Sequence, residues 1–344
     1  MFILLYKERV IQRFSCVKEK NMYNHTMSKY IPCNPNASEE ARSVLDYLSA
    51  LRGRGILLGQ HTQTRLQEEL KSILEITGKE PALCGFELLA YSPNINYGES
   101  SQECLTEVEE NKNTLGLAWE WARRKGIVTL TWHWYSPLYG ADKAFYQKYT
   151  PFDARLVLEE GTPERAAFFS DMDVMAELLK PFCEKRVPIL WRPFHEANGD
   201  WFWWGSRGPQ TAKGLWLEMY ERYTKVHKLD NLIWVWNSPL PEGYVGDEYC
   251  DIISRDVYLK EHTHSDYQKE YDELVQITKA DKITALGETG PIPDIAALSQ
   301  THVPWTWFMT WSRGVFKNMT KAEVLKAAYS NDYGITLDKL PALY

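Results

Sequence analysis

The sequence predicts an α/β protein that folds as a single (β/α)8 TIM barrel, and three observations predict it. Eight strand-like apolar runs alternate with amphipathic segments between residues 55 and 330. The runs are nearly continuously apolar, as the strands of a helix-covered parallel sheet are. An open, doubly wound sheet would carry a glycine fingerprint after its first strand, whereas the glycines of "GRGILLG" (53–59) have the wrong spacing and precede the strand.

The barrel is expected to occupy residues 38–344 and to be preceded by a leader. In "SEEARSVLDYLSALRG" (38–53), Ser38 is a helix cap, two glutamates lie in the first turn and Gly53 closes the helix. Residues 1–37 lack periodicity and end among prolines and asparagines, so we interpret them as a leader or N-terminal arm.

Each predicted strand is an apolar run, and most are followed by a segment whose apolar residues have helical spacing. The expected strands are residues 55–61, 82–88, 127–134, 187–196, 232–237, 251–258, 282–289 and 303–311. The helices expected after them are residues 65–77, 111–125, 166–186, 211–227, 266–280, 294–300 and 320–330, with a short turn region after the fifth strand.

The composition favours a water-soluble protein with an uncharged, polar ligand. The net charge of −7 gives no basic face, so neither nucleic acid nor an anionic membrane is an expected partner. No run approaches the ~20 apolar residues that a membrane helix needs. The 14 Trp and 20 Tyr residues suit flat ligands with polar edges, sugars above all.

Several well-known catalytic and metal motifs are missing from the sequence. It has no Walker loop, no GxSxG elbow and no HExxH pair, since no second histidine follows His195 and Glu196 at that spacing. The six cysteines form no CxxC pair, so they indicate neither a zinc site nor a redox motif. We interpret them as buried thiols or as one or two disulfides.

Polar residues gather where the predicted strands end. In a TIM barrel the active site lies at the carboxyl ends of the strands, while residues lower in the strands form the core. The candidates at these ends are Gln60, His61, His133, Arg192, His195, Glu196, Asp256, Tyr258, Glu288 and Trp311. Glu196 on the fourth strand and Glu288 on the seventh should therefore face each other across the mouth of the barrel.

Two facing carboxyl groups are what glycoside hydrolysis requires. One group protonates the leaving oxygen while the other attacks, so neither a metal ion nor another cofactor is expected. Simpler interpretations stay open: Glu196 as a buried partner of Arg192, Glu288 as a strand-end residue, and His133 as a hydrogen-bonded structural residue.

The tryptophans near Glu196 also allow two interpretations. Trp201, Trp203 and Trp204 lie on a short run in which alternate side chains point to opposite faces if the chain is extended. At least one of them is therefore expected to pack in the core, and the others are candidates for contacts with a sugar.

Six stretches of the sequence resemble, in order, blocks of glycoside hydrolase family 26, most of whose members are β-mannanases. They are "TWHWYSP", "YTPFDARLVLEEGTPE", "LWRPFHEANGDWFWWG", "NLIWVWNS", "RDVY" and "ALGETGPIPD". The likeness runs from about Gly55 to Trp311. It implies hydrolysis of β-1,4-mannosidic bonds in mannan-type polysaccharides with retention of configuration.

The resemblance also implies roles for single residues. Glu196 matches the general acid/base and Glu288 matches the nucleophile. Five further residues match substrate-binding positions around the cleaved bond: His133, His195, Trp201, Tyr258 and Trp311. Of these, Tyr258 also matches the tyrosine that hydrogen-bonds the nucleophile.

The aromatic residues around Glu196 give this assignment a physical basis. Indole and phenyl rings would exclude water from Glu196 and raise its pKa, so that it stays protonated near neutral pH. Glu288 must stay ionised, which hydrogen bonds from Tyr258 and His133 would favour. Retention of configuration requires the two carboxyl groups to lie about 5–5.5 Å apart.

Two long, turn-rich segments, residues 89–111 and 136–164, leave the mode of cleavage open. Either could close one end of the cleft and restrict cleavage to chain ends, or line an open cleft with Tyr139, Tyr146 and Phe152. Two other functions also stay open: action on mixed-linkage glucan or β-1,3-xylan, and a catalytically silent carbohydrate-binding barrel. A polysaccharide substrate implies secretion, although no clear signal peptide is readable.

Overall fold

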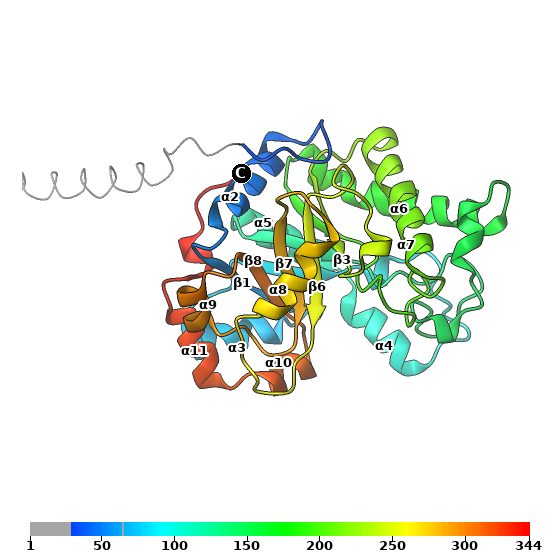
Figure 1. The fold of residues 1–344 in the computed structure, drawn as a ribbon. Coiled ribbons are helices and arrows are strands. Elements are labelled where there is room, and N and C mark those ends of the chain that lie inside the picture. Colours follow the sequence, from blue (N-terminus) through cyan, green and yellow to red (C-terminus); the bar gives the residue numbers. More distant parts are fainter. Residues whose placement is uncertain (1–28, 64) are drawn as a thin grey trace, which may run out of the picture. The chain divides into compact units, whose positions relative to one another are not determined.

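The computed structural model describes residues 29–63 and 65–344, of which residues 31–344 form one compact unit. Its eight barrel strands are β1 (Ile56–Thr62), β2 (Leu83–Glu87), β3 (Ile127–Thr131), β4 (Ile189–Arg192), β5 (Leu232–Asn237), β6 (Ile252–Val257), β7 (Ile283–Thr289) and β8 (Trp305–Thr310). Each pairs in parallel with the next, and β1 pairs with both β2 and β8, so the ring is closed. The predicted (β/α)8 barrel is confirmed (Figure 1).

Helices alternate with the strands and pack around them (Figure 1). The first begins where the sequence predicts, because the Ser38 hydroxyl accepts a hydrogen bond of 3.2 Å from the backbone N–H of Ala41. The helices are α2 (Glu39–Leu51), α3 (Glu68–Thr77), α4 (Gln102–Asn111), α5 (Thr114–Arg123), α6 (Pro163–Glu184), α7 (Pro209–Glu221), α8 (Gln268–Leu274), α9 (Ile295–Thr301), α10 (Gly314–Met319) and α11 (Ala322–Ser330).

The helix predicted over residues 111–125 is confirmed as α5, with shorter ends, but helix α4 directly before it was not predicted. Asn113 separates them with a φ of +69°, a left-handed conformation that an α-helix cannot contain. Helix α4 is held beside the loop that follows β3: Lys143 pairs with Glu107 at 2.7 Å, and Ser101 Oγ donates to Asp142 at 2.6 Å. Figure 1 shows α4 next to this loop.

The other helix predictions differ from the structure mainly at their ends. The expected helix 266–280 is shorter, since α8 ends at Leu274 and continues only as the 3₁₀ turn Val275–Ile277. The expected helix 211–227 corresponds to α7 together with the π-helical turn Arg222–Val226. These differences leave the order of strands and helices unchanged.

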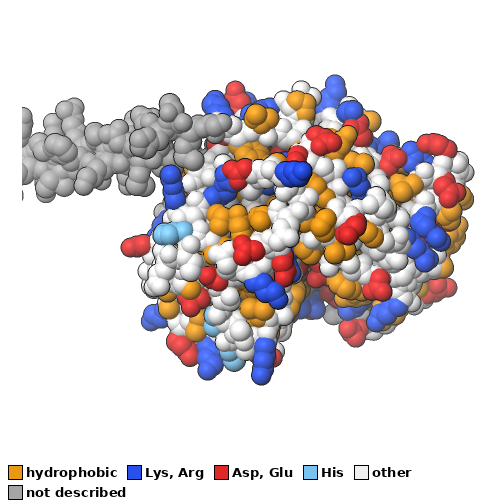
Figure 2. Space-filling view, viewed as in Figure 1, with side chains coloured by type: hydrophobic (Ala, Val, Ile, Leu, Met, Phe, Trp, Pro, Cys, Tyr) orange, Lys and Arg blue, Asp and Glu red, His pale blue; other side chains and the backbone are white. Residues whose placement is uncertain are grey.

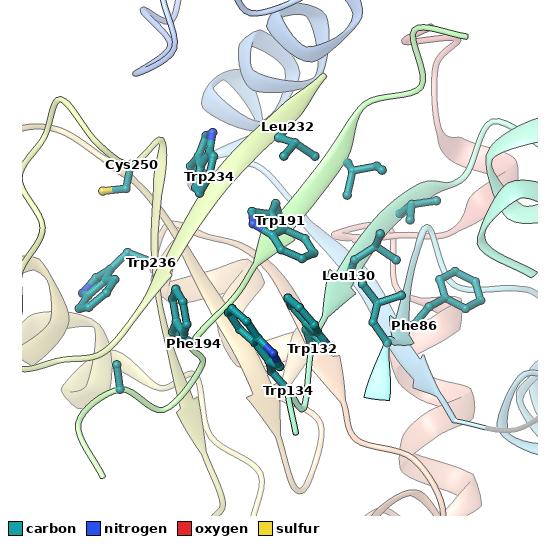
Figure 3. Packing of buried hydrophobic residues seen from close by; sticks show 14 of the residues in the cluster. Phe86, Leu130, Trp132, Trp134, Trp191, Phe194, Leu232, Trp234, Trp236 and Cys250 are labelled. Atoms are coloured by element: carbon teal, nitrogen blue, oxygen red, sulfur yellow. The ribbon is translucent and has the colours of Figure 1, made fainter. Parts of the chain in front are cut away.

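Tryptophans fill much of the core on the β3–β5 side of the barrel. The rings of Trp132 and Trp134 stack face to face with centroids 4.1 Å apart, and Figure 3 shows them between Leu130 and Phe194. Trp203 and Trp204 are fully buried, which confirms that part of the 201–204 run is core. Phe152 is also fully buried, so it cannot line a cleft as one interpretation of the sequence suggested.

The segment before α2 is hydrogen-bonded to the barrel. The backbone N–H of Cys33 donates to Asp251 at 2.7 Å, and Asn34 Nδ2 donates to Asp230 at 2.9 Å. The domain boundary between residues 37 and 38 stays a prediction, and most of the expected leader, residues 1–28, lies outside the described residues.

Among described cysteines all five are free thiols, while Cys16 lies outside this part of the chain.

A ninth strand, β9 (Gly334–Ile335), pairs in parallel with the beginning of β1, where Ile56 is opposite Gly334. On the face shown in Figure 2, acidic and basic side chains are interspersed. Within residues 29–63 and 65–344, no helix has the length and apolar character needed to cross a membrane.

Candidate active site

The carboxyl ends of β3, β4, β6 and β7 are joined by one buried cation, Arg192. Its guanidinium donates to Asp256 on β6 at 3.0 Å, to Thr131 on β3 at 3.1 Å, and to Glu288 on β7. Burial alone would lower the pKa of Arg192, but the charges of Asp256 and Glu288 raise it above its ordinary value. Arg192 therefore stays charged, and it pairs with Asp256 and Glu288 instead of with Glu196 as one interpretation of the sequence had it.

Glu288 lies within β7, almost fully buried, and both of its oxygens accept hydrogen bonds. Oε1 accepts from Arg192, and Oε2 accepts from the hydroxyl of Tyr258 at 2.7 Å. Tyr258 follows β6 and is 46% exposed. A guanidinium and a phenol thus hold both oxygens of Glu288 in place.

Glu196 lies on the turn after β4 and has a different environment. Its φ of +51° is unusual for a residue with a side chain, and such backbone strain clusters at functional sites. The turn is fixed by Asn237 at the end of β5, whose Oδ1 accepts from the Glu196 N–H at 2.6 Å. Trp204 Nε1 adds a second restraint by donating to the carbonyl of His195 at 2.8 Å.

The carboxyl group of Glu196 has a single hydrogen-bond donor in the described structure, Trp201 Nε1 at 2.7 Å. Burial raises the pKa of Glu196 to about 6, the charge of Glu288 adds to the increase, and the hydrogen bond from Trp201 opposes it. Gly199 makes room for this arrangement, since a Cβ there would come within 2.1 Å of the Trp201 ring.

The acidic groups of the site are close together. One carboxylate oxygen each from Glu196, Asp256 and Glu288 lie within 4.8 Å of one another. Such a group has the spacing of a metal site, but the guanidinium of Arg192 already bonds two of its members, so the positive charge that a cation would bring is supplied by the protein.

Two histidines lie against this acidic group and are themselves linked. His133 Nδ1 is 2.6 Å from the buried carboxylate of Glu87, and His133 Nε2 is 3.2 Å from His195 Nε2. Burial lowers the pKa of His133, but Glu87 and then Glu288 more than offset this, so the pKa lies above its usual value. The pKa of His195 is far below its usual value because of burial and the neighbouring charge of His133. His133 makes its bonds to Glu87 and His195, whereas the sequence suggested a bond to Glu288.

Aromatic rings form the sides of the mouth. Trp311 follows β8 and stacks on His61 with centroids 3.8 Å apart, and its ring is 5.6 Å from that of His133. Trp201 is 42% exposed, in contrast to the buried Trp203 and Trp204. Phe202 packs its ring 4.9 Å from His195. All seven site residues predicted from the sequence thus lie at the carboxyl ends of strands or on the turns that follow them.

Sequence reasoning missed two residues of the site, Glu87 and Asn237. Each is the last residue of its strand, buried and polar after an apolar run, which is the signal that could have found them. Asn237 Nδ2 donates to Asp256 at 2.7 Å while its Oδ1 holds the Glu196 turn, so this one side chain connects the two sides of the site.

A TIM barrel with two facing carboxyl groups at the carboxyl ends of its strands is an arrangement on which glycoside hydrolases are built. The sequence comparison agrees with this class. The model of glycosyl hydrolase family 26 matches residues 33–339, so the chain belongs to this family.

Relatives of the chain carry mannanase names. The mannan endo-1,4-β-mannosidase of Thermothelomyces thermophilus is 38% identical over 323 residues, covering 89% of this chain and 62% of the relative. Mannan endo-1,4-β-mannosidase A of a Piromyces species is 31% identical over 318 residues, covering 90% of this chain and 50% of the relative. The chain thus spans about half to three fifths of the length of these relatives.

Solved structures give the same result for the fold. A Podospora anserina β-(1,4)-mannanase that carries a CBM35 module superposes with a TM-score of 0.82 at 34% identity, covering 93% of this chain and 70% of that one. The β-mannanase of a symbiotic protist of the termite Reticulitermes speratus, solved with a gluco-manno-oligosaccharide, gives a TM-score of 0.81 at 28% identity, covering 90% and 97%.

Proposed function

We propose that this chain hydrolyses β-1,4-mannosidic bonds in mannan-type polysaccharides with retention of configuration, using Glu196 as general acid/base and Glu288 as nucleophile. The observation that carries the proposal is the contrast between two carboxyl groups whose oxygens lie within 4.8 Å. Burial raises the pKa of Glu196 to about 6, whereas Glu288 is held by Arg192 and Tyr258. The mannanase names of the relatives support the choice of sugar.

In the first step, Glu196 gives its proton to the glycosidic oxygen while Glu288 attacks the anomeric carbon from the opposite face. The bond to the leaving sugar breaks, and a glycosyl-enzyme ester forms on Glu288. The short separation of the two carboxyl groups favours this route, since an inverting enzyme needs room for a water molecule between the sugar and its base.

In the second step, Glu196 is a carboxylate and takes a proton from a water molecule that attacks the anomeric carbon. The ester bond to Glu288 breaks and the sugar leaves with its original configuration. Tyr258 and Arg192 keep the Glu288 oxygens in place through both steps. Trp201 and Trp311 offer ring faces on which the neighbouring sugars can stack.

The roles of the two glutamates are tested by removing each in turn. Glu196→Ala should still form the ester from an activated aryl β-mannobioside, whose leaving group needs no proton. Added azide needs no general base, so it should restore turnover and yield a β-glycosyl azide. Glu288→Ala should form no ester, and azide in the space it leaves should give the α product.

The outcome can contradict the proposal in two ways. Azide products of the opposite anomers would exchange the two roles. Full activity of both variants on unactivated mannan would show that neither glutamate is catalytic. The two catalytic carboxyl groups would then have to be other residues.

The substrate is tested by comparing soluble mannan, lichenan and β-1,3-xylan. We expect cleavage of mannan above the other two, and product analysis on mannohexaose would show whether cleavage is internal or from chain ends. Preference for lichenan or xylan would assign the chain to another substrate, and binding of mannan without cleavage would make it a carbohydrate-binding barrel. Because a polysaccharide is too large to enter cells, secretion is part of the proposal.

A further inference from the structure

Trp311, which the proposed function uses as a surface for a sugar, is tied to the carboxyl end of β1. There Gln60 Nε2 donates to the carbonyls of Thr310 and Trp311 at 3.1 and 3.3 Å, and Thr310 Oγ1 donates back to Gln60 Oε1 at 2.6 Å. Just after the strand, Gln63 Oε1 accepts from the hydroxyl of Ser312 at 2.9 Å. The chain on both sides of Trp311 is therefore fixed by hydrogen bonds to two glutamines.

The plane of the Trp311 ring depends on a different contact. Between the two glutamines, His61 places its ring face to face with that of Trp311, with the centroids 3.8 Å apart and the planes inclined by 13°. The other ring contact of Trp311 among the described residues is with His133, at 5.6 Å and an angle of 64°, which is an edge contact. Stacking on His61 therefore covers one face of the indole and leaves the opposite face for a sugar.

The side chain of His61 makes no polar contact within the described residues. Neither ring nitrogen has a hydrogen-bond partner there, and the side chain is fully buried, so a sugar at the mouth does not reach it. Burial and then the charges of Arg192 and His133 hold the pKa of His61 well below its usual value, so the ring is uncharged and forms no ion pair. The contact through which His61 can influence the site is the flat face that it shares with Trp311.

The space around His61 fits a small, flat ring. Gly85 on β2 is opposite His61 in the pairing of β1 with β2. A Cβ at position 85 would come within 2.9 Å of His61 Cδ2 and 2.3 Å of Met309 Sδ, so the missing side chain gives the imidazole its place. Because protein interiors are close-packed, a thicker side chain at position 61 would displace the indole that lies on it.

We propose that His61 is a positioning residue that fixes the plane of the Trp311 ring by stacking on it, so that the indole presents a single face to the sugar. A ring that is oriented before the sugar arrives loses less entropy on binding. The inference rests on the proposed function for the part that the sugar plays, whereas the stacking itself can be tested without a substrate.

The first test observes Trp311 directly. The protein is labelled with fluorotryptophan, and the fluorine NMR signal of Trp311 is identified as the one missing from Trp311→Phe. His61→Leu removes the flat ring and keeps the space filled, so the Trp311 signal should shift or broaden, and His61→Ala should have the same effect. Leu57→Ala empties a fully buried position on the same face of β1 and should leave the Trp311 signal where it is in the wild type.

The second test is a double-mutant cycle in kcat/KM on soluble mannan. His61→Leu should lower kcat/KM about five- to tenfold in the wild type. In a Trp311→Ala background the same change should have almost no effect, because the ring that His61 positions is gone. Leu57→Ala should leave kcat/KM unchanged, and thermal unfolding checks that every variant is folded at the temperature of the assay.

A Trp311 signal that stays in place in both His61 variants would overturn the inference, and so would equal losses of kcat/KM in the two backgrounds. Failure of the proposed function would look different. The wild type would then not cleave mannan, while the Trp311 signal would still move in the His61 variants and in this way support the positioning role.

Discussion

The two glutamates of the site are the same residue type in opposite surroundings. Glu288 lies inside a barrel strand, where a guanidinium and a phenol bond its two oxygens. Glu196 lies on a strained turn among aromatic rings, where one indole N–H is its only donor in the described structure. Burial raises the pKa of Glu196 to about 6, and this contrast in surroundings is what our proposal uses to give the two glutamates different roles.

The largest effect is expected from removing the cation on the Glu288 side. Arg192→Met leaves Asp256 and Glu288 buried side by side without a positive partner, which should lower the free energy of unfolding by about 3–5 kcal/mol. Urea unfolding measures this. Arg155→Met, which breaks only an exposed pair with Asp153, should change stability little. Equal stability of the two variants would show that Arg192 is not what holds the acidic pair.

A smaller effect is expected from the phenol on the same side. Tyr258→Phe removes one hydrogen bond to Glu288 and keeps the half-exposed ring, so kcat should fall by about 10²-fold while affinity for mannan stays near that of the wild type. Tyr244→Phe removes a comparable bond, of 2.6 Å to Asp247, that involves no residue of the site, and it should leave kcat unchanged. An unchanged kcat for Tyr258→Phe would remove this tyrosine from the mechanism.

On the Glu196 side, neighbouring tryptophans should respond differently. Trp201→Ala should cost about 1–3 kcal/mol in kcat/KM and little in unfolding, because the ring is partly exposed, and Trp311→Ala should behave similarly. Trp204→Ala empties a fully buried position and should cost about 3–5 kcal/mol in unfolding. Loss of stability in Trp201→Ala without a selective kinetic defect would assign Trp201 to the core.

The smallest expected effect is a shift in the pH dependence of kcat/KM. Glu196 must be protonated to act as the acid, so kcat/KM should fall as the pH rises through its pKa of about 6. The hydrogen bond from Trp201 lowers this pKa, so Trp201→Phe should move the alkaline limb of the pH profile to higher pH. Trp311→Phe removes no bond to Glu196 and serves as the control. A limb that stays in place or moves to lower pH in Trp201→Phe would contradict the assignment.

The sequence was sufficient to predict the barrel because each strand is a self-contained apolar run. The end of each run marks a position at the mouth, and for this reason the order of the strands alone places Glu196 opposite Glu288. The helix boundaries around Asn113 were not predictable in the same way, because a left-handed residue between two helical segments leaves the apolar spacing almost unbroken.

The partners of each side chain were the part that the sequence could not provide. Arg192 is only four residues before Glu196 in the sequence, yet its guanidinium pairs with Asp256 and Glu288 on other strands. Glu87 and His133 are 46 residues apart and meet only because β2 and β3 are neighbours. Such pairings depend on the closed ring, since sequence distance says nothing about which strand ends face each other.

The pairing of β1 with the last strands of the chain has a consequence for how the protein is made. Residues 56–60 of β1 find their partners at Trp307–Thr310 and at Gly334–Ile335. During synthesis, the edge of β1 that pairs with β8 and β9 therefore has no partner until almost the whole described chain has been translated. Contacts over such sequence separations form slowly, and exposed strand edges are prone to aggregate. We therefore expect expression yield to depend on chaperones that shield β1 until the ring closes.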